Sequence, residues 1–172
     1  MKLVKASLEP PSGLKMLLEQ LGTTGENGFM GTGQPANTDT LASYLQSLMD
    51  MDNGANLRPE WVPMTTYWLL DNEEQIVGVS RLRHQLTLAL LNDGGHIGYY
   101  VLRSQRRKGY GNTILRLTLV EARKLGIQRA LLTVESDNIP SIHIAEANGG
   151  QLEDERLDED GVLYRRYWID LG

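Results

Sequence analysis

The sequence contains no cysteine, only three histidines and no long apolar run. Without cysteine there is no disulfide framework, no thiolate zinc site and no cysteine nucleophile. The histidines do not form an HExxH pair and no GxxxxGK[ST] loop is present, so neither a metal site nor a P-loop is predicted. No segment approaches the ~18 consecutive apolar residues that a membrane span needs.

Positive charge is also scarce, because 17 Lys and Arg residues stand against 22 Asp and Glu residues, a net charge of −5. Nucleic acid and anionic membranes are therefore not expected as partners. Residues 1–6 lack the apolar core of a signal peptide. This start, together with the absence of cysteine, fits the cytoplasmic location that we expect.

A length of 172 residues, 41% of them hydrophobic, is typical of one globular domain, here expected over residues 1–172. Apolar periodicity predicts helices at 10–21, 38–51, 109–125 and 140–147, and one helical turn within 85–91. Strands are expected at 2–6, 63–70, 75–83, 95–102, 129–135, 151–156 and 162–169. The glycine-rich segment 22–36 is predicted to be a loop. Since strands and helices do not alternate strictly, the order predicts an α+β domain with a mixed sheet.

The most informative stretch is 99–112, where a strand ends, a basic turn follows and two glycines open a helix. The first N–H groups of a helix lack internal partners and lie at the positive end of the helix dipole. Gly109 and Gly111 have no Cβ, so a phosphate can approach the backbone closely. This arrangement favours a pyrophosphate over the alternative of a solvated basic turn. A Rossmann site fits less well, because Ile114 stands where GxGxxG needs its third small residue.

Residues 106–111 read RRKGYG, which resembles the R/Q-x-x-G-x-G/A element of the GNAT superfamily of N-acetyltransferases. A second element, Asn138 to Ser141 followed by Glu146 to Gly149, is similar to the N-x-x-S…E-x-x-G pattern of that family. The resemblance covers about residues 77–169, and within the superfamily it is to uncharacterised predicted bacterial acetyltransferases. It implies a central, mostly antiparallel twisted sheet of six to seven strands with a splayed parallel pair, flanked by about four helices. Homodimers are common in such proteins.

The same resemblance implies acetyl-CoA as the cofactor and a bulged, splayed strand at 99–102. The pantetheine arm would pair with the backbone of Tyr100 and Val101, and the N–H of Val101 would hold the developing oxyanion. Asn138 and Ser141 would lie near the pantetheine arm, with helix capping as the alternative for both. The pyrophosphate would lie on Arg106, Arg107, Lys108, Gly109, Tyr110, Gly111 and Asn112.

The implied reaction is direct acetyl transfer to the amine of a small molecule or amino acid, which needs a base to deprotonate the ammonium. His96 is the first choice, since its reference pKa of ~6.5 suits proton abstraction. Glu135 is the second choice, and for both the alternative is an ordinary strand residue. Ala145 stands where many family members have a tyrosine that protonates the leaving thiolate. Tyr164, Ser141 or water would have to replace it.

The sequence leaves the acceptor open. Acidic residues at 153–155 and 158–160 suit a cationic amine, whereas Arg81 and Arg83 suit an acceptor carboxylate. Two other functions also stay open. Because Ala145 cannot protonate the thiolate, one alternative is a catalytically silent regulatory module that binds acyl-CoA. The other is an adaptor that binds a protein partner through segment 22–36.

Overall fold

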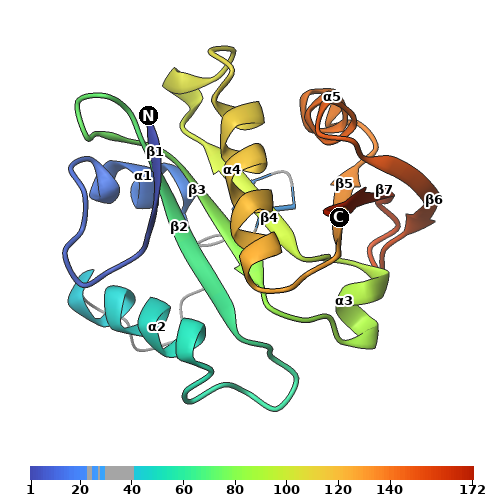
Figure 1. The fold of residues 1–172 in the computed structure, drawn as a ribbon, viewed down its shortest axis with the longest axis horizontal. Helices are drawn as coiled ribbons and strands as arrows, with labels where there is room; N and C mark the ends of the chain where they lie inside the picture. Colours follow the sequence, from blue (N-terminus) through green and yellow to red (C-terminus); the bar gives the residue numbers. More distant parts are fainter. Residues whose placement is uncertain (23–24, 27, 30–40) are drawn as a thin grey trace.

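The structure is a computed structural model that describes residues 1–22, 25–26, 28–29 and 41–172 (Figure 1). The described helices are α1 (Leu14–Leu21), α2 (Leu41–Asn53), α3 (Leu88–Asn92), α4 (Tyr110–Lys124) and α5 (Ile139–Ala147), with a 3-10 turn η1 (Arg103–Gln105). The strands are β1 (Lys2–Lys5), β2 (Met64–Leu70), β3 (Ile76–Arg83), β4 (Ile97–Val101), β5 (Arg129–Glu135), β6 (Gln151–Leu157) and β7 (Leu163–Asp170). The predicted α+β class is confirmed, with α3 as a fifth helix. Most of segment 22–36, and the predicted start of the second helix at 38–40, lie outside the described residues.

The strands form two antiparallel sheets, in the orders β1–β2–β3–β4 and β5–β7–β6. The expected central sheet is therefore divided between β4 and β5, which are connected through α4 in the crossover typical of parallel strands. No ladder joins these two described strands. A single backbone bond holds them where they approach, from the N–H of His96 to the carbonyl of Leu131 at 2.7 Å.

Past the His96–Leu131 hydrogen bond, β4 and β5 separate, and a bulge in β4 is not the cause. The β3 and β4 strands keep one register from the pair Leu82–Ile97 to the pair Gly78–Val101. The bulge that the family resemblance implied is thus absent from the ladder between these described strands. The sheets part because β4 stays with β3 while β5 pairs with β7.

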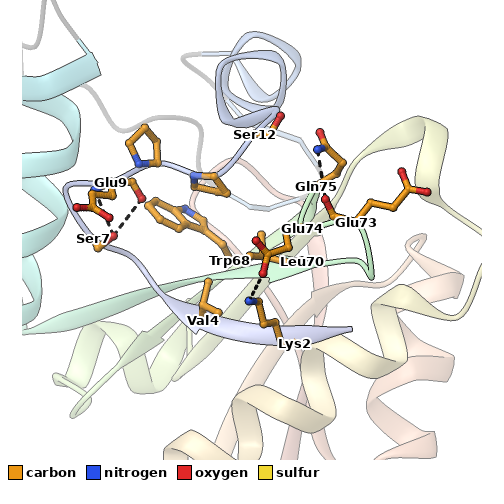
Figure 2. A pocket seen from close by; sticks show the side chains of 12 residues that line it. Lys2, Val4, Ser7, Glu9, Ser12, Trp68, Leu70, Glu73, Glu74 and Gln75 are labelled. Atoms are coloured by element: carbon orange, nitrogen blue, oxygen red, sulfur yellow. Dashed lines mark hydrogen bonds and ion pairs between the residues drawn. The ribbon is translucent and has the colours of Figure 1, made fainter.

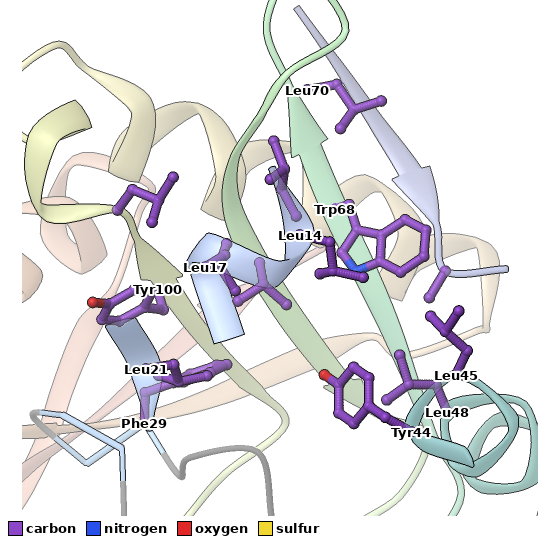
Figure 3. Close-up of a cluster of buried hydrophobic side chains, with 14 residues drawn as sticks. Leu14, Leu17, Leu21, Phe29, Tyr44, Leu45, Leu48, Trp68, Leu70 and Tyr100 are labelled. Carbon is purple, nitrogen blue, oxygen red and sulfur yellow. The ribbon is translucent and has the colours of Figure 1, made fainter. Parts of the chain in front are cut away.

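Helices cover both faces of the four-stranded sheet (Figure 1). Trp68 and Leu70 point to the face of α1 and α2, where they join the cluster drawn in Figure 3. Tyr67 and Leu69 point to the other face and pack in clusters with residues of α4. Alternate residues of β2 are apolar on both faces because both faces are covered. Each fully buried large side chain contributes about 1.5–3 kcal/mol to folding.

The α4 helix is amphipathic, and its buried residues are Ile114, Leu115, Thr118, Leu119 and Ala122. One polar contact fixes the helix on the sheet, since the hydroxyls of Ser80 and Thr118 lie 2.7 Å apart in the core. The packing of this stripe against β3 and β4 sets where the N-terminus of α4 lies relative to the end of β4.

Candidate active site

The space between β4 and β5 is a cleft of about 870 Å³. One end lies at the junction of η1 and α4, and the other lies among β3, the end of β5 and the β6–β7 turn. All predicted site residues except His96 and Lys108 line this cleft.

The N-terminus of α4 opens onto the cleft. Gly109 precedes the helix with a φ of 80°, and the N–H of Thr113 donates to the Gly109 carbonyl at 3.1 Å. The N–H groups of residues 110–112 have no partner among the described residues. A Cβ at Gly109 would meet nothing within 4 Å. Three free donors, the helix dipole and open space together favour the binding of an anion here.

The second glycine of the motif lines the cleft and has a further structural role that was not predicted. A Cβ at Gly111 would lie 2.6 Å from Cδ1 of Ile144, so this glycine lets α4 and α5 pack closely. Asn112 ties the same helices together, because its side-chain oxygen accepts from the Asn148 amide at 2.7 Å. Lys108 points elsewhere and donates to Gln105 at 2.9 Å.

A carboxylate that the sequence motifs did not indicate, Glu26, pairs with the basic turn. It accepts from Arg103 Nη2 at 3.1 Å and from Arg106 Nη1 at 3.0 Å, and the hydrogen bond from Arg106 lowers the pKa of Glu26. Arg106 also donates from Nε to the Val101 carbonyl at 3.1 Å and stacks over the Tyr100 ring at 5.3 Å. Arg106 therefore already holds an internal anion where a pyrophosphate was predicted.

Backbone direction decides which residue of β4 can donate into the cleft. The N–H of Leu102 donates to the Val77 carbonyl at 3.0 Å, and Tyr100 is paired with Val79 in the same ladder. Because N–H groups of alternate residues point to opposite edges of a strand, that of Val101 points away from β3 and toward the cleft. Of the two residues predicted to pair with pantetheine, Val101 offers its backbone and Tyr100 only its ring.

The start of α5 forms the opposite wall. Asn138 caps the helix, since its side-chain oxygen accepts from the Ser141 N–H at 3.3 Å, and both residues line the cleft. Capping is thus confirmed for Asn138, and it is compatible with the predicted place of both residues near the pantetheine arm. Ala145 is fully buried in the core, and the Tyr164 hydroxyl is engaged by the Asn92 carbonyl at 2.9 Å. Tyr99 lines the cleft from β4, and burial raises its pKa to about 12.

His96 joins the two sheets and does not line the cleft. Its side chain is 8% exposed, and its Nδ1 accepts the N–H of Leu131 at 3.0 Å. Burial, with a further effect from the nearby charge of Arg83, lowers the pKa of His96 to about 4. The imidazole is therefore neutral at pH 7, with Nδ1 already engaged. This geometry suits a structural tie better than a base.

Glu135 ends β5 inside the cleft. Burial raises its pKa, and the carboxylates of Asp137, Asp158 and Asp93 raise it further. No side chain of the described residues pairs with this carboxylate. Gly28 lies against it, because a Cβ there would be 3.4 Å from Glu135 Oε1. A raised pKa and an unpaired carboxylate are properties that a base near neutral pH requires.

Sequence reasoning missed Glu26, Phe29, Asp93 and Thr133, which also line the cleft. Glu26 and Phe29 lie in a glycine-rich segment without periodicity, which gave no signal. Asp93 precedes two glycines in a turn, a pattern that indicates a loop but no function.

A second, shallower groove lies along β1 and the 73–75 turn (Figure 2). The Lys2 ammonium and the Glu74 carboxylate bridge it at 2.6 Å, and both are exposed. None of the predicted site residues lines this groove. Among the described residues there is also no cluster of metal-ligating side chains and no helix able to cross a membrane.

The divided sheet with a cleft at its opening is the fold of known GNAT-family acetyltransferases. The chain belongs to the acetyltransferase (GNAT) family, whose sequence profile matches residues 36–149. The N-acetyltransferase YfmK of Bacillus subtilis, itself uncharacterised, is 37% identical over 68 residues, which cover 40% of this chain and 46% of that protein. The match therefore spans less than half of that relative.

Solved structures of this family have the same fold. A GNAT-family acetyltransferase from Streptococcus pneumoniae superposes with a TM-score of 0.67 at 14% identity and covers 99% of both chains. The structure of yncA from Salmonella typhimurium, described as an acetyltransferase with its cofactor acetyl-CoA, gives 0.66 at 14% identity, over 99% of this chain and 94% of that one. At these identities the likeness concerns the fold alone.

Proposed function

We propose that the protein is an acetyl-CoA-dependent N-acetyltransferase that transfers the acetyl group directly to the amine of a small molecule. One observation carries this proposal: the free N–H groups at 110–112, the outward N–H of Val101 and the carboxylate of Glu135 all line one cleft. Membership of the GNAT family supports it, as does the acetyl-CoA found with yncA.

The described residues fit acetyl-CoA. The N-terminus of α4 offers donors for the pyrophosphate, and the space above Gly109 leaves room for it. The edge of β4 at Val101 offers a donor to the thioester. Acetyl-CoA supplies the acetyl group already activated as a thioester.

The chain's own groups then carry the reaction. The N–H of Val101 donates to the thioester oxygen and stabilises the negative charge that grows there. Glu135 takes a proton from the acceptor ammonium, directly or through water, so that the nitrogen lone pair is free. As the C–N bond forms and the C–S bond breaks, the nitrogen loses its second proton to water. The departing thiolate would take a proton from solvent, because Ala145 offers none.

The test of this site is a matched pair of glycine variants at the two ends of α4. Gly109 and Gly126 have φ values of 80° and 81°, and a Cβ at either meets nothing within 4 Å. Glutamate therefore strains the backbone similarly at both positions, but only Gly109→Glu places a carboxylate at the anion site. Calorimetric titration with acetyl-CoA should show binding to wild type and Gly126→Glu, and none to Gly109→Glu. Unchanged affinity in Gly109→Glu would refute the placement of the site.

Ala145 favours a second candidate, a regulatory module that binds acyl-CoA without turnover. The two functions differ in one assay, the release of free CoA thiol in the presence of amines. Thiol release that depends on an amine supports the enzyme. Tight acetyl-CoA binding without thiol release from any amine supports the module.

A further inference from the structure

The end of the cleft that lies away from α4, among β3, the end of β5 and the β6–β7 turn, is called the acceptor end here. It contains two arginines of β3. Arg81 and Arg83 are two residues apart, so their side chains lie on the same face of the strand, and both line the cleft. Burial lowers the pKa of both side chains. The charge of Arg81 lowers the pKa of Arg83 further. The two guanidinium groups nevertheless give this wall positive charge, although the protein as a whole is acidic.

Arg83 is held in place by neutral groups. Its Nη1 donates to the carbonyls of Gly94 and Gly95 at 2.9 and 3.0 Å. The charge of Asp93 acts on it, but no carboxylate of the described residues is hydrogen-bonded to it. A partly buried guanidinium without a paired carboxylate is unfavourable, and it also keeps free donors in a planar fork that matches a carboxylate.

The position of Arg83 relative to Glu135 follows from β5. The N–H of Gly94 donates to Thr133 Oγ1 at 3.1 Å, so the turn that holds Arg83 contacts β5 at Thr133. Glu135 lies two residues beyond Thr133, about 6.6 Å from it along the strand, so Glu135 and Arg83 line the same end of the cleft. An α-amino acid that is hydrogen-bonded at its amine and its carboxylate spans about 8–9 Å between protein atoms, which is the separation of Arg83 and Glu135 that such a ligand requires.

We propose that the acceptor is an amino acid or a related amino carboxylate, with its carboxylate on Arg83 and its amine at Glu135. This inference rests on the proposed acetyl transfer and adds the class of acceptor. The cleft has opposite charges at the two positions, as a zwitterion requires. A polyamine would gain from Glu135, Asp93 and Asp158 but would bring a second positive charge toward Arg81 and Arg83.

The test compares acceptors that differ only in the carboxylate. Thiol release from acetyl-CoA is measured with each L-amino acid, with its carboxamide and with spermidine. We expect at least one amino acid to be acetylated, with a kcat/KM at least 100-fold above that of its amide and that of spermidine. Failure of every amino acid, or amides and spermidine used equally well, overturns the inference.

Variants locate the carboxylate on Arg83. Arg83→Gln should raise the KM for the amino acid about 100-fold and remove the preference over the amide, while the affinity for acetyl-CoA stays unchanged. Arg83→Lys keeps the positive charge and should therefore keep part of the preference for the amino acid over its amide. This second variant also tests the assignment if Arg83→Gln folds poorly. The matched control is Arg129→Gln on β5, since Arg129 stacks on Trp168 at 4.9 Å and does not line the cleft. An unchanged preference in both Arg83 variants overturns the assignment.

The two proposals fail in different ways. If acetyl-CoA does not bind wild-type protein in the glycine experiment, the proposed function itself is wrong. If acetyl-CoA binds and spermidine is acetylated but no amino acid is, the function stands and the carboxylate inference is wrong.

Discussion

Replacing His96 distinguishes between two roles of this residue, a structural link between the sheets and a catalytic base. In His96→Ala the N–H of Leu131 loses its acceptor in the core, which costs about 1–3 kcal/mol. The loss of packing by an imidazole that is 8% exposed adds to this. In His96→Asn the side-chain oxygen takes the position of Nδ1 and can accept the same N–H. We therefore expect a large loss of stability for alanine and a much smaller one for asparagine.

The pH dependence of stability gives a second signature. The pKa of His96 falls from 6.5 in the unfolded chain to about 4 in the fold. As the pH falls, His96 therefore binds a proton in the unfolded chain before it does so in the fold. The stability that the neutral His96 contributes to the fold is complete above pH 6.5 and is lost between about pH 6.5 and 4. The shift corresponds to about 3 kcal/mol. Wild type should lose this stability on acidification, whereas His96→Asn should lose less.

Urea denaturation at pH 7.5 and pH 5 measures both effects, and amine-dependent thiol release measures catalysis on the same samples. We expect His96→Asn to keep kcat within about 3-fold of wild type. A folded His96→Asn protein whose kcat falls 100-fold or more would refute the structural interpretation and restore His96 as the base.

Three further predictions follow from single contacts. Glu26→Gln removes the carboxylate that competes for the arginines of the basic turn, and should raise the affinity for acetyl-CoA up to about 5-fold in titration calorimetry. Weaker binding would mean that Glu26 assists the ligand. Gly95→Ala places a Cβ against the Leu131 carbonyl oxygen at a φ of 57°, and should lower the free energy of unfolding by at least ~2 kcal/mol in urea. A stability near wild type would contradict that packing. Glu135→Gln should abolish the acidic limb of the kcat/KM profile, since turnover by the carboxylate base rises as the pH passes its raised pKa. Retention of the limb would exclude Glu135 as its source.

Elements whose signals are local were predictable from the sequence. Arg129–Glu135 is a strand with the predicted bounds, because its apolar run ends at polar turn residues. The α4 helix begins one residue after the glycine that was expected to open it, at the junction where the anion site was predicted. The motif around that junction is contiguous, so neighbouring residues determine both the turn and the free N–H groups.

Residues that depend on distant contacts were not predictable in the same way. Glu26 reaches the basic turn across 77 residues of sequence, and His96 contacts Leu131 across 35. Neither contact leaves a periodic or compositional trace, because it arises only when separate elements pack together. The sequence also gave no sign that α5 packs closely against Gly111, because that contact forms only in the fold.

By itself, the sequence determined the α+β class, the strand-to-helix junction before Tyr110 and the family. These follow from short-range rules of hydrogen bonding and periodicity that act along the chain. Only the tertiary structure decided that the N–H of Tyr100 points toward β3, that His96 is buried between the sheets and that Glu135 and Arg83 line the same cleft. Burial and the local electric field set those properties, and both are sums over residues that only folding brings together.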